Sequence, residues 1–353
     1  MKITNIIICG DLFDQDYPSY SDFDNFCKSN NDLNFFVIPG NHDSILNEKY
    51  FTSSNIKVIN QSEIVNFDDS SFLFIPYNFN KSIDEEVSRF LTVCEKEEER
   101  SFENYVLIGH GDYITSSFNI NINGYEDGLY MPLTPNTINK YNFKKVILGH
   151  IHKPSNFGKV YYPGSPFPIN TTETGKRSFI VYDTSNDNID RIFIDTDFIY
   201  LNIEILSFPG EDEFSLIKKQ IDKYIFNYDL KENELKKVIL LLKIKGFTKD
   251  IKNLVKLIVG YLKELGLRIY EKDSLNKDSS NKSELSKDDT YKNWINIDEL
   301  KNINEIDSVK MVLFENFKQK LETLDLQNLL INGNSVSCLK EDIMMDGMNI
   351  IFD

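Results

Sequence analysis

The chain has 353 residues, of which 41% are hydrophobic and 27% are charged, and its formal net charge is −16. This length can bury a full core and exceeds one average domain, so we expect two domains with extensions. The negative charge argues against a protein that coats nucleic acids, since phosphate binding needs Lys and Arg. It is compatible with a nuclease, because bound divalent cations supply positive charge at one place.

The first part of the chain alternates short apolar runs with polar stretches. Most of these runs are strand-like and end in Gly or Pro, which is typical of a layered α/β domain. The runs are I-T-N-I-I-I-C-G, N-F-F-V-I-P-G, S-F-L-F-I-P-Y, Y-V-L-I-G-H, K-V-I-L-G-H and R-S-F-I-V-Y-D. The charged stretch Ser82–Arg100 between two of them predicts a surface helix. We therefore predict one domain over residues 1–195.

A second unit is predicted over residues 196–271. Its apolar spacing alternates between the strand period and the helix period in the order βαβαβ, which makes a small α/β cap domain. The segments are F-I-Y-L-N-I-E-I, E-F-S-L-I-K-K-Q-I-D-K-Y-I, V-I-L-L-L-K-I-K-G, I-K-N-L-V-K-L-I-V-G-Y-L and L-R-I-Y. Residues 272–292 contain almost no apolar side chains and predict a flexible linker. Residues 293–353 form a C-terminal extension with an amphipathic helix near Asp307–Leu324.

The chain shows no signal for a membrane or an oxidising compartment. No run approaches the roughly 18 apolar residues that a membrane span needs. The N-terminal apolar run continues into Gly10 and Asp11 without a cleavage site for a signal peptide. The four cysteines are scattered without a C-x-x-C pair, which argues against a zinc ribbon or a disulfide framework. We expect a cytoplasmic protein without membrane contact.

All four histidines lie close to a glycine where an apolar run ends. A single histidine is more often a core or surface residue than a ligand. If that were true of all four histidines, they would not all be expected to lie beside a glycine at the end of an apolar run. In open α/β sheets the carboxyl ends of the strands are where ligands bind. The motifs are Gly40-Asn41-His42-Asp43, Gly109-His110 and Gly149-His150-Ile151-His152, and Gly10-Asp11-Leu12-Phe13-Asp14 adds carboxylates in the same context.

These residue types favour a metal site. Carboxylate, amide oxygen and imidazole ligands together suit divalent ions such as Mn²⁺, Fe²⁺ or Zn²⁺. A carboxylate that can bridge, with imidazoles on both sides, suits two ions roughly 3.5 to 4 Å apart. Such a site activates water and stabilises charge on a phosphoryl group. Hydrolysis of phosphoesters is the reaction that we expect.

The ordered motifs G-D-L-F-D, P-G-N-H-D, I-G-H-G and L-G-H-I-H resemble those of the calcineurin-like metallophosphoesterases. The resemblance implies a layered β-sandwich flanked by helices and two divalent metal ions, with Mn²⁺ as the first choice. It implies that Asp11 bridges the ions and that Asp14 supports the site without binding metal. The remaining ligands would be Asn41, His110 and His150 at one ion and His152 at the other.

The same resemblance implies roles in catalysis for two further residues. His42 would lie beside the scissile phosphate, where it stabilises the transition state or protonates the leaving oxygen. Asp43 would orient His42.

Within that superfamily, the motifs most resemble the nuclease subunit of the SbcC and SbcD complex in double-strand-break repair. The pointers are V-I-P-G-N-H-D and the run Y-Y-P-G-S-P-F-P at Tyr161–Pro168. The cap and the extension match in shape alone. The resemblance implies DNA as the substrate and an SMC-like ATPase as the partner. The helix near Asp307–Leu324 would either dock on that ATPase or pack on its own cap. The sequence leaves open whether the subunit forms a homodimer.

One family motif is absent, because no Asp-x-His occurs anywhere in the sequence. In the family this motif ends a first strand and supplies two ligands to one ion. Either the chain is a shortened version of an active enzyme, or it is a short protein that is degenerate or completed by another polypeptide. We expect at most one well-held ion, weak or absent nuclease activity, and an exposed apolar sheet edge that lowers solubility.

Two rival functions remain open from the sequence. The first is a general metallophosphoesterase that acts on small phosphoesters or phosphoproteins, which a cap closing the cleft against duplex DNA would favour. The second is a catalytically inactive subunit that keeps the fold in order to bind the ATPase. The missing Asp-x-His favours this second rival, whereas the intact Asn41, His42 and Asp43 disfavour it.

Overall fold

The computed structural model describes most of the chain in two compact units. The first unit comprises residues 1–167 and 177–195, and the second comprises residues 168–176 and 196–353. The described residues are 3–15, 19–98, 104–115, 128–210, 213–269, 295–303, 308–324 and 336–352. The predicted linker 272–292 lies outside them, and so does Asp307 at the start of the predicted C-terminal helix.

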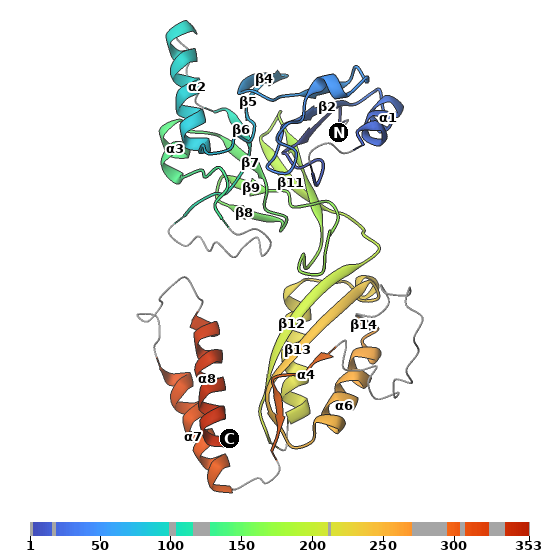
Figure 1. The fold of residues 1–353 in the computed structure, drawn as a ribbon, viewed down its shortest axis with the longest axis vertical. Helices are drawn as coiled ribbons and strands as arrows, with labels where there is room; N and C mark the ends of the chain where they lie inside the picture. The colour runs from blue at the N-terminus through green and yellow to red at the C-terminus, as the bar shows by residue number, and fades with distance from the viewer. Residues whose placement is uncertain are drawn as a thin grey trace. The chain divides into compact units, whose positions relative to one another are not determined.

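The first unit begins with a three-stranded parallel sheet in the order β1-β2-β3 (Figure 1). Its elements are β1 (Asn5–Ile8), α1 (Ser21–Ser29), β2 (Asn34–Val37), the 3-10 helix η1 (Glu48–Tyr50) and β3 (Ile56–Val58). Cys27 on α1 and Phe35 and Val37 on β2 are buried in one cluster, so α1 covers one face of this sheet. Among the described residues β1 pairs with β2 alone, which makes β1 an edge strand with partly exposed side chains.

A six-stranded mixed sheet has the order β4-β5-β6-β7-β9-β8. Its strands are β4 (Glu63–Phe67), β5 (Ser70–Ile75), β6 (Val106–His110), β7 (Lys145–Gly149), β8 (Ser155–Phe157) and β9 (Val160–Tyr162). The helices of this part are α2 (Ile83–Glu98) and α3 (Pro135–Lys140). A capping box starts α2, because Ser82 and Glu85 each accept a hydrogen bond from the other's backbone N–H. Ile83, Val87 and Leu91 of α2 then pack on the sheet.

The opposite face of the six-stranded sheet is covered by other strands. Phe72, Phe74 and Ile108 on this face contact Ile7 and Phe36 of the three-stranded sheet. The antiparallel pair β10 (Ser178–Asp183) and β11 (Asn188–Phe193) packs against the same cluster through Ile180 and Tyr182. Strand layers therefore face each other across a common core, with helices outside. This is the layered β-sandwich flanked by helices that the sequence predicts.

In the second unit, helices pack on a five-stranded parallel sheet. Its strands are β12 (Ile199–Ser207), β13 (Val238–Thr248), β14 (Arg268–Ile269), β15 (Ile295–Asn296) and β16 (Leu300–Asn302). Its first helices are α4 (Glu213–Asn227), α5 (Glu232–Leu235) and α6 (Ile251–Glu264), the last capped by the Asp250 carboxylate.

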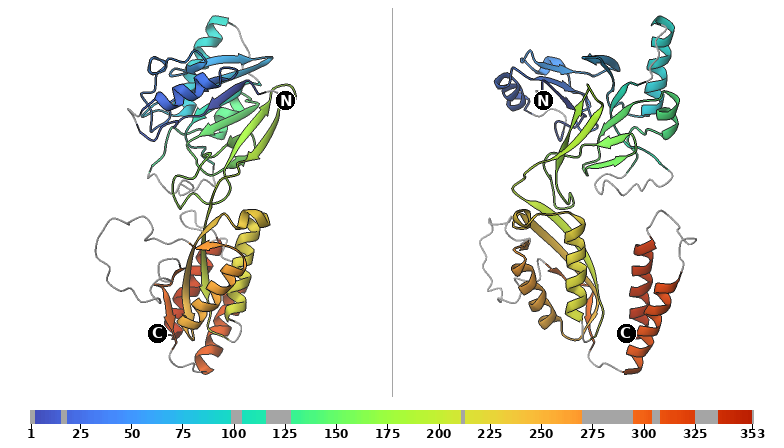
Figure 2. Two further views of the ribbon diagram at one scale, coloured as in Figure 1. Left: turned by 90° about the vertical axis from the view of Figure 1, so that its right-hand side faces the viewer. Right: turned by 180° about the vertical axis from the view of Figure 1, so that it is seen from behind.

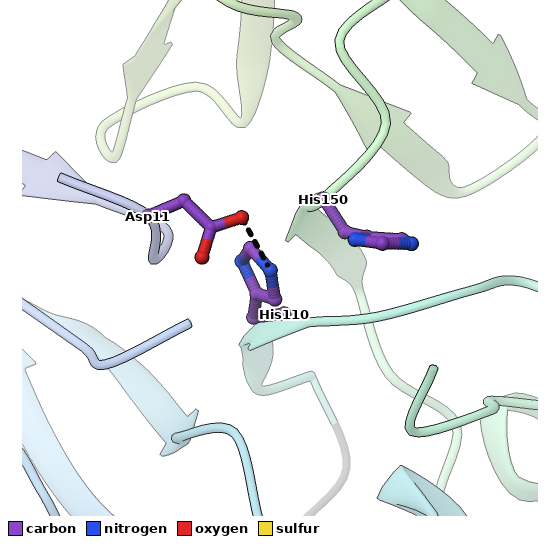
Figure 3. Close-up of side chains that lie close together, drawn as sticks. All are labelled: Asp11, His110 and His150. Atoms are coloured by element: carbon purple, nitrogen blue, oxygen red, sulfur yellow. Dashed lines mark ion pairs between the residues drawn. The ribbon is translucent and has the colours of Figure 1, made fainter. Parts of the chain in front are cut away.

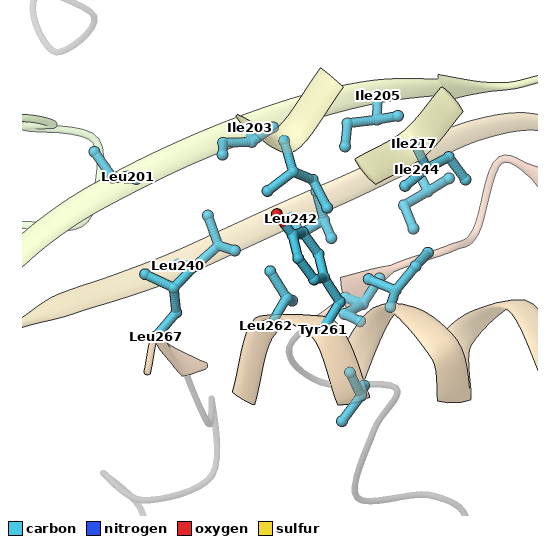
Figure 4. Packing of buried hydrophobic residues seen from close by; sticks show 14 of the residues in the cluster. Leu201, Ile203, Ile205, Ile217, Leu240, Leu242, Ile244, Tyr261, Leu262 and Leu267 are labelled. Carbon is cyan, nitrogen blue, oxygen red and sulfur yellow. The ribbon is translucent and has the colours of Figure 1, made fainter. Parts of the chain in front are cut away.

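Alternate residues of β12 and β13 are buried against α4 and α6 on one face, as Figure 4 shows. The opposite face bears ion pairs, such as Lys243 with Glu299. The order β12-α4-β13-α6-β14 is the βαβαβ order that the sequence predicts. Residues 295–302 add two strands to this sheet, although the sequence places them in a separate extension.

Two further helices complete the second unit, α7 (Ser308–Thr323) and α8 (Val336–Phe352), and they lie side by side in both views of Figure 2. Phe314 and Leu321 of α7 are buried with Met348 of α8 and Phe247 of β13. Helix α7 occupies the predicted position near 307–324, and α8 is not predicted by the sequence. No helix in the described part of the chain is long and apolar enough to cross a bilayer.

Candidate metal centre

The site forms where four strands end. Asp11 follows β1, Asn41 follows β2, His110 is the last residue of β6, and His150 follows β7. Strands β1 and β2 are parallel in one sheet, and β6 and β7 are parallel in the other. Because the carboxyl ends of parallel strands meet at one edge, residues more than a hundred positions apart come together.

Asp11, His110 and His150 form a tight group. Their ligand atoms all lie within 4.8 Å of one another. Figure 3 shows the Asp11 carboxylate facing the His110 ring, with His150 beside them. His110 Nε2 lies 3.0 Å from Asp11 Oδ2 and 2.8 Å from Asn41 Oδ1. His150 Nδ1 lies 3.2 Å from the same Asn41 oxygen. Four candidate ligand atoms from the ends of four strands therefore lie close together.

The contacts of His110 indicate that this point suits a cation. His110 Nδ1 lies 2.7 Å from the carbonyl oxygen of Cys9, which can only accept, so Nδ1 carries the hydrogen. The neutral ring then directs the Nε2 lone pair at two oxygens, those of Asp11 and Asn41. This arrangement is repulsive unless a proton or a metal ion lies between them. A histidine whose other nitrogen donates to a carbonyl is the usual arrangement in metal sites. The donor set fits a divalent ion.

The pKa values of Asp11 and His110 are shifted in opposite directions, and each shift favours the charged form of its group. Burial by itself raises the pKa of Asp11, but the hydrogen bond and charge of His110 outweigh it and hold that pKa below its ordinary value. Burial lowers the pKa of His110, but the Asp11 carboxylate outweighs it and raises that pKa. Without metal, a proton is therefore favoured at the position that the cation would take.

The backbone around the site is crowded and strained. Asp11 and His150 have φ values of 52° and 90°, a region that residues with side chains rarely adopt. A Cβ atom added at Gly40 would lie 2.1 Å from Asp11 Oδ1. Such conformations cost about 1–3 kcal/mol each and persist where the surroundings enforce them, often at functional sites.

His42 and the two remaining carboxylates lie beside this group. The backbone N–H of His42 donates to Asp11 Oδ1 at 3.0 Å, and its ring Nδ1 lies 3.2 Å from the carbonyl oxygen of Asp14. The Asp14 carboxylate is 3.7 Å from the same nitrogen. Asp43 is buried and accepts hydrogen bonds from the backbone of Gly40 and Phe13. Asp43 thus ties the two loops together, and its expected role in orienting His42 stays a prediction.

His152 is not part of the group of three ligands found among the described residues. Its carbonyl oxygen accepts hydrogen bonds from the Arg177 guanidinium at 2.8 Å and from the backbone N–H of Ser165 at 3.0 Å. Arg177 is only 1% exposed and also donates to the Ser165 hydroxyl. Arg177 therefore fixes the loop that carries His152. The sequence does not single it out, because an isolated arginine before a strand carries no local signal.

Asp112 is a second residue that the sequence does not single out. It lies two positions after His110, it is 3% exposed, and its Oδ1 lies 3.7 Å from His150 Nε2. Its position in I-G-H-G-D next to a histidine motif was the available signal.

One solved structure shows a weak similarity to this chain. A solved structure of a protein from Staphylococcus aureus, described as a 5′-nucleotidase in complex with alpha-ketoglutarate, matches at 15% identity and a TM-score of 0.29. The match covers 58% of this chain and 44% of that one, so the chain spans less than half of that protein, and a likeness at this score carries no argument. No curated protein sequence matches the chain.

A match to a protein family covers the region that contains Asp11, Asn41, His110 and His150. Residues 3–154 match the family model of the calcineurin-like phosphoesterases. The chain therefore contains a region, residues 3–154, that is similar to the calcineurin-like phosphoesterases.

Proposed function

We propose that this chain is a metal-dependent phosphodiesterase that cleaves DNA as the nuclease subunit of an SbcD-like complex. The observation that carries the catalytic part is the convergence of Asp11, Asn41, His110 and His150 on one point. The phosphodiester substrate rests on the resemblance of the motifs to those of SbcD-like nucleases. One well-held divalent ion, with Mn²⁺ as the first choice, accounts for the ligands that converge.

Each residue of the site has a role in this proposal. Asp11, Asn41, His110 and His150 would hold the ion, which when bound polarises a phosphoryl oxygen and lowers the pKa of water. His42 is partly exposed beside them, with its Nδ1 next to the Asp14 carbonyl oxygen. That contact favours hydrogen on Nδ1 and leaves Nε2 to exchange a proton with the leaving oxygen. Arg177 holds the loop of His152 in place.

The partner in this proposal is an SMC-like ATPase that supplies most of the DNA contacts. The net charge of −16 supports this assignment of the DNA contacts to the partner, because 55 acidic residues outnumber 39 Lys and Arg and repel phosphate groups. Helix α7 exposes Val312 and Leu313 while it buries Phe314, so it can pack on its own unit and still present an apolar face. That face is where we propose that the ATPase docks.

The test compares diester and monoester hydrolysis by the purified chain. Linear duplex DNA and bis-p-nitrophenyl phosphate report on diesters, and p-nitrophenyl phosphate reports on monoesters, each with Mn²⁺ and with EDTA. We expect weak Mn²⁺-dependent cleavage of the diesters and its loss in His110→Ala, which keeps the net charge. Hydrolysis of the monoester alone would instead support a general phosphoesterase. Cleavage that persists in His110→Ala would overturn the assignment of the site.

A second candidate is the catalytically inactive subunit. One observation favours it, because the described residues contain a single group of three or more metal-binding side chains, Asp11, His110 and His150. Absence of all hydrolysis, together with retained binding to an SMC-like ATPase in a pull-down of purified components, would establish this candidate. Cleavage of DNA by the chain would exclude it.

A further inference from the structure

Asp112 is a buried carboxylate beside the candidate metal centre and outside the group of converging ligands. It lies at the end of β6, two residues after His110, and only 3% of it is exposed. Burying a carboxylate is costly unless it is hydrogen-bonded or faces a positive group. Its contacts therefore indicate what it does.

Three hydrogen bonds hold Asp112 rigidly against residues 130–133. Its backbone N–H donates to the carbonyl oxygen of Tyr130 at 2.8 Å, and its carbonyl oxygen accepts from Leu133 at 2.8 Å. The backbone N–H of Tyr130 donates to Asp112 Oδ2 at 2.8 Å. With Oδ2 occupied in this way, the orientation of the carboxylate is fixed, and Oδ1 points elsewhere.

Oδ1 of Asp112 faces the imidazole of His150 at 3.7 Å from Nε2, while Nδ1 of the same ring faces the metal centre 3.2 Å from Asn41 Oδ1. The ring of Tyr130 packs on this imidazole with 4.8 Å between ring centroids. At 3.7 Å the carboxylate acts through charge and not through a hydrogen bond. The amide oxygen of Asn41 competes for the hydrogen at Nδ1, but it is neutral, whereas Asp112 carries a full charge in a buried site. The charge therefore favours the hydrogen on Nε2.

The consequence for His150 is a defined tautomer. With hydrogen on Nε2, the lone pair of Nδ1 points at the metal centre. In His110 the two nitrogens have the opposite roles. The Cys9 carbonyl oxygen favours the hydrogen on Nδ1, so the lone pair of Nε2 faces the metal centre. Both histidines thus have an oxygen opposite their ligating nitrogen, as metal-binding histidines usually do.

We propose that Asp112 is the positioning residue of His150, which fixes its ring and its tautomer so that Nδ1 is the ligating nitrogen. This inference rests on the proposed metal-dependent function and adds a residue to it. Asp112 lies outside the group of candidate ligands found among the described residues. It acts by setting which nitrogen of His150 carries the hydrogen before the metal binds.

The test uses Asp112→Asn, which keeps the shape and the acceptor for Tyr130 but replaces the charge with an amide. The amide can donate to His150 Nε2 and so reverse the tautomer. Asp84→Asn is the matched control, because the Asp84 carboxylate also accepts from the backbone of this segment, at Thr134, at 3.1 Å. Two measurements are made on each protein. They are the ¹⁵N shifts of the imidazoles without metal, which the four histidines make assignable, and the affinity for Mn²⁺ by calorimetry.

We expect the Nε2–H tautomer of His150 in the native protein and in Asp84→Asn. In Asp112→Asn we expect the Nδ1–H tautomer and an affinity for Mn²⁺ that is about 10- to 100-fold lower. An unchanged tautomer together with an affinity within twofold of the native protein would overturn the proposal. If the native protein binds no Mn²⁺, the proposed function fails. The tautomer in Asp112→Asn then decides the role of Asp112 by itself.

Discussion

The strand end that precedes His150 has no room for a side chain. A Cβ atom added at Gly149 would lie 1.9 Å from the carbonyl oxygen of Cys9 and 2.8 Å from His110 Nδ1. These are the two atoms whose hydrogen bond fixes the tautomer of His110. We therefore predict that Gly149→Ala lowers the melting temperature by several degrees and weakens Mn²⁺ binding more than about tenfold. Calorimetric scans and Mn²⁺ titrations measure both effects.

Gly260 provides the matched control for this substitution. It lies in α6, and a Cβ atom there would meet nothing within 4 Å. Gly260→Ala should stabilise the protein by about 0.5–1 kcal/mol, because alanine has the higher helix propensity. Binding of Mn²⁺ by Gly149→Ala at native affinity would show that the site does not depend on this close approach.

One buried carboxylate on helix α1, that of Asp24, connects the helix to the segment before β3. Asp24 accepts hydrogen bonds from Lys28 at 2.7 Å, from the Thr52 hydroxyl at 2.6 Å and from the Ser53 backbone at 2.8 Å. These contacts, first that of Lys28 and then that of Thr52, hold the pKa of Asp24 well below its ordinary value. The carboxylate therefore links α1 to the segment that leads into β3.

The lowered pKa of Asp24 predicts sensitivity to acid. The unfolded chain takes up the proton first, near the ordinary aspartate pKa of about 3.9, so the stabilisation is complete above that pH. It is lost as the pH falls toward the folded pKa. Asp24→Asn should melt at a lower temperature at neutral pH and lose less stability on acidification than the native protein. Asp22→Asn, at an exposed position of the same helix, is the control. Parallel acid curves for Asp24→Asn and the native protein would contradict this account.

Helix α7 has two faces with different expected energetics. Phe314 is fully buried with Phe247 and Met348, whereas Val312 is 61% exposed. Phe314→Ala should destabilise the second unit by about 3–5 kcal/mol, because it leaves a cavity. Val312→Ala should change stability by less than about 0.5 kcal/mol. Denaturant unfolding measures both, and equal effects would show that α7 does not pack on its unit through Phe314.

The elements that the sequence predicts are those with long, regular patterns. In β12 and β13, alternate residues are buried over many positions, and that alternation is visible in the sequence. Strands β15 and β16 have only two and three residues. They form because their backbones pair with β13. Such strands are decided by tertiary context and leave no pattern.

The same distinction applies to the site. The positions of the glycine motifs at strand ends could be predicted, because each follows an apolar run. Asp112 and Arg177 could not, because their roles depend on where distant loops return. Asp112 acts at His150 only because residues 130–133 hold it in place, and nothing local in the sequence encodes that approach.

For the whole molecule, the net charge and the bound metal ion should together determine the affinity of the chain for DNA. With a net charge of −16, the metal-free chain should bind duplex DNA more weakly than about 10⁻⁴ M at physiological salt, the weak end for non-specific binding. Mn²⁺ at the site supplies local positive charge and should strengthen binding at least tenfold. Fluorescence anisotropy of a labelled duplex measures this in EDTA and in Mn²⁺.

His110→Ala separates a bound ion from general screening, because it keeps the net charge of −16 and removes a ligand. If Mn²⁺ acts at the site, the variant should show no gain in DNA binding when Mn²⁺ is added. If Mn²⁺ only screens repulsion between two polyanions, the variant and the native chain should gain equally, and Mg²⁺ should act as well as Mn²⁺. Equal increases in DNA affinity for the native chain and His110→Ala would mean that the bound ion does not contribute to DNA binding. The contacts with DNA would then have to come from a partner that carries the basic groups.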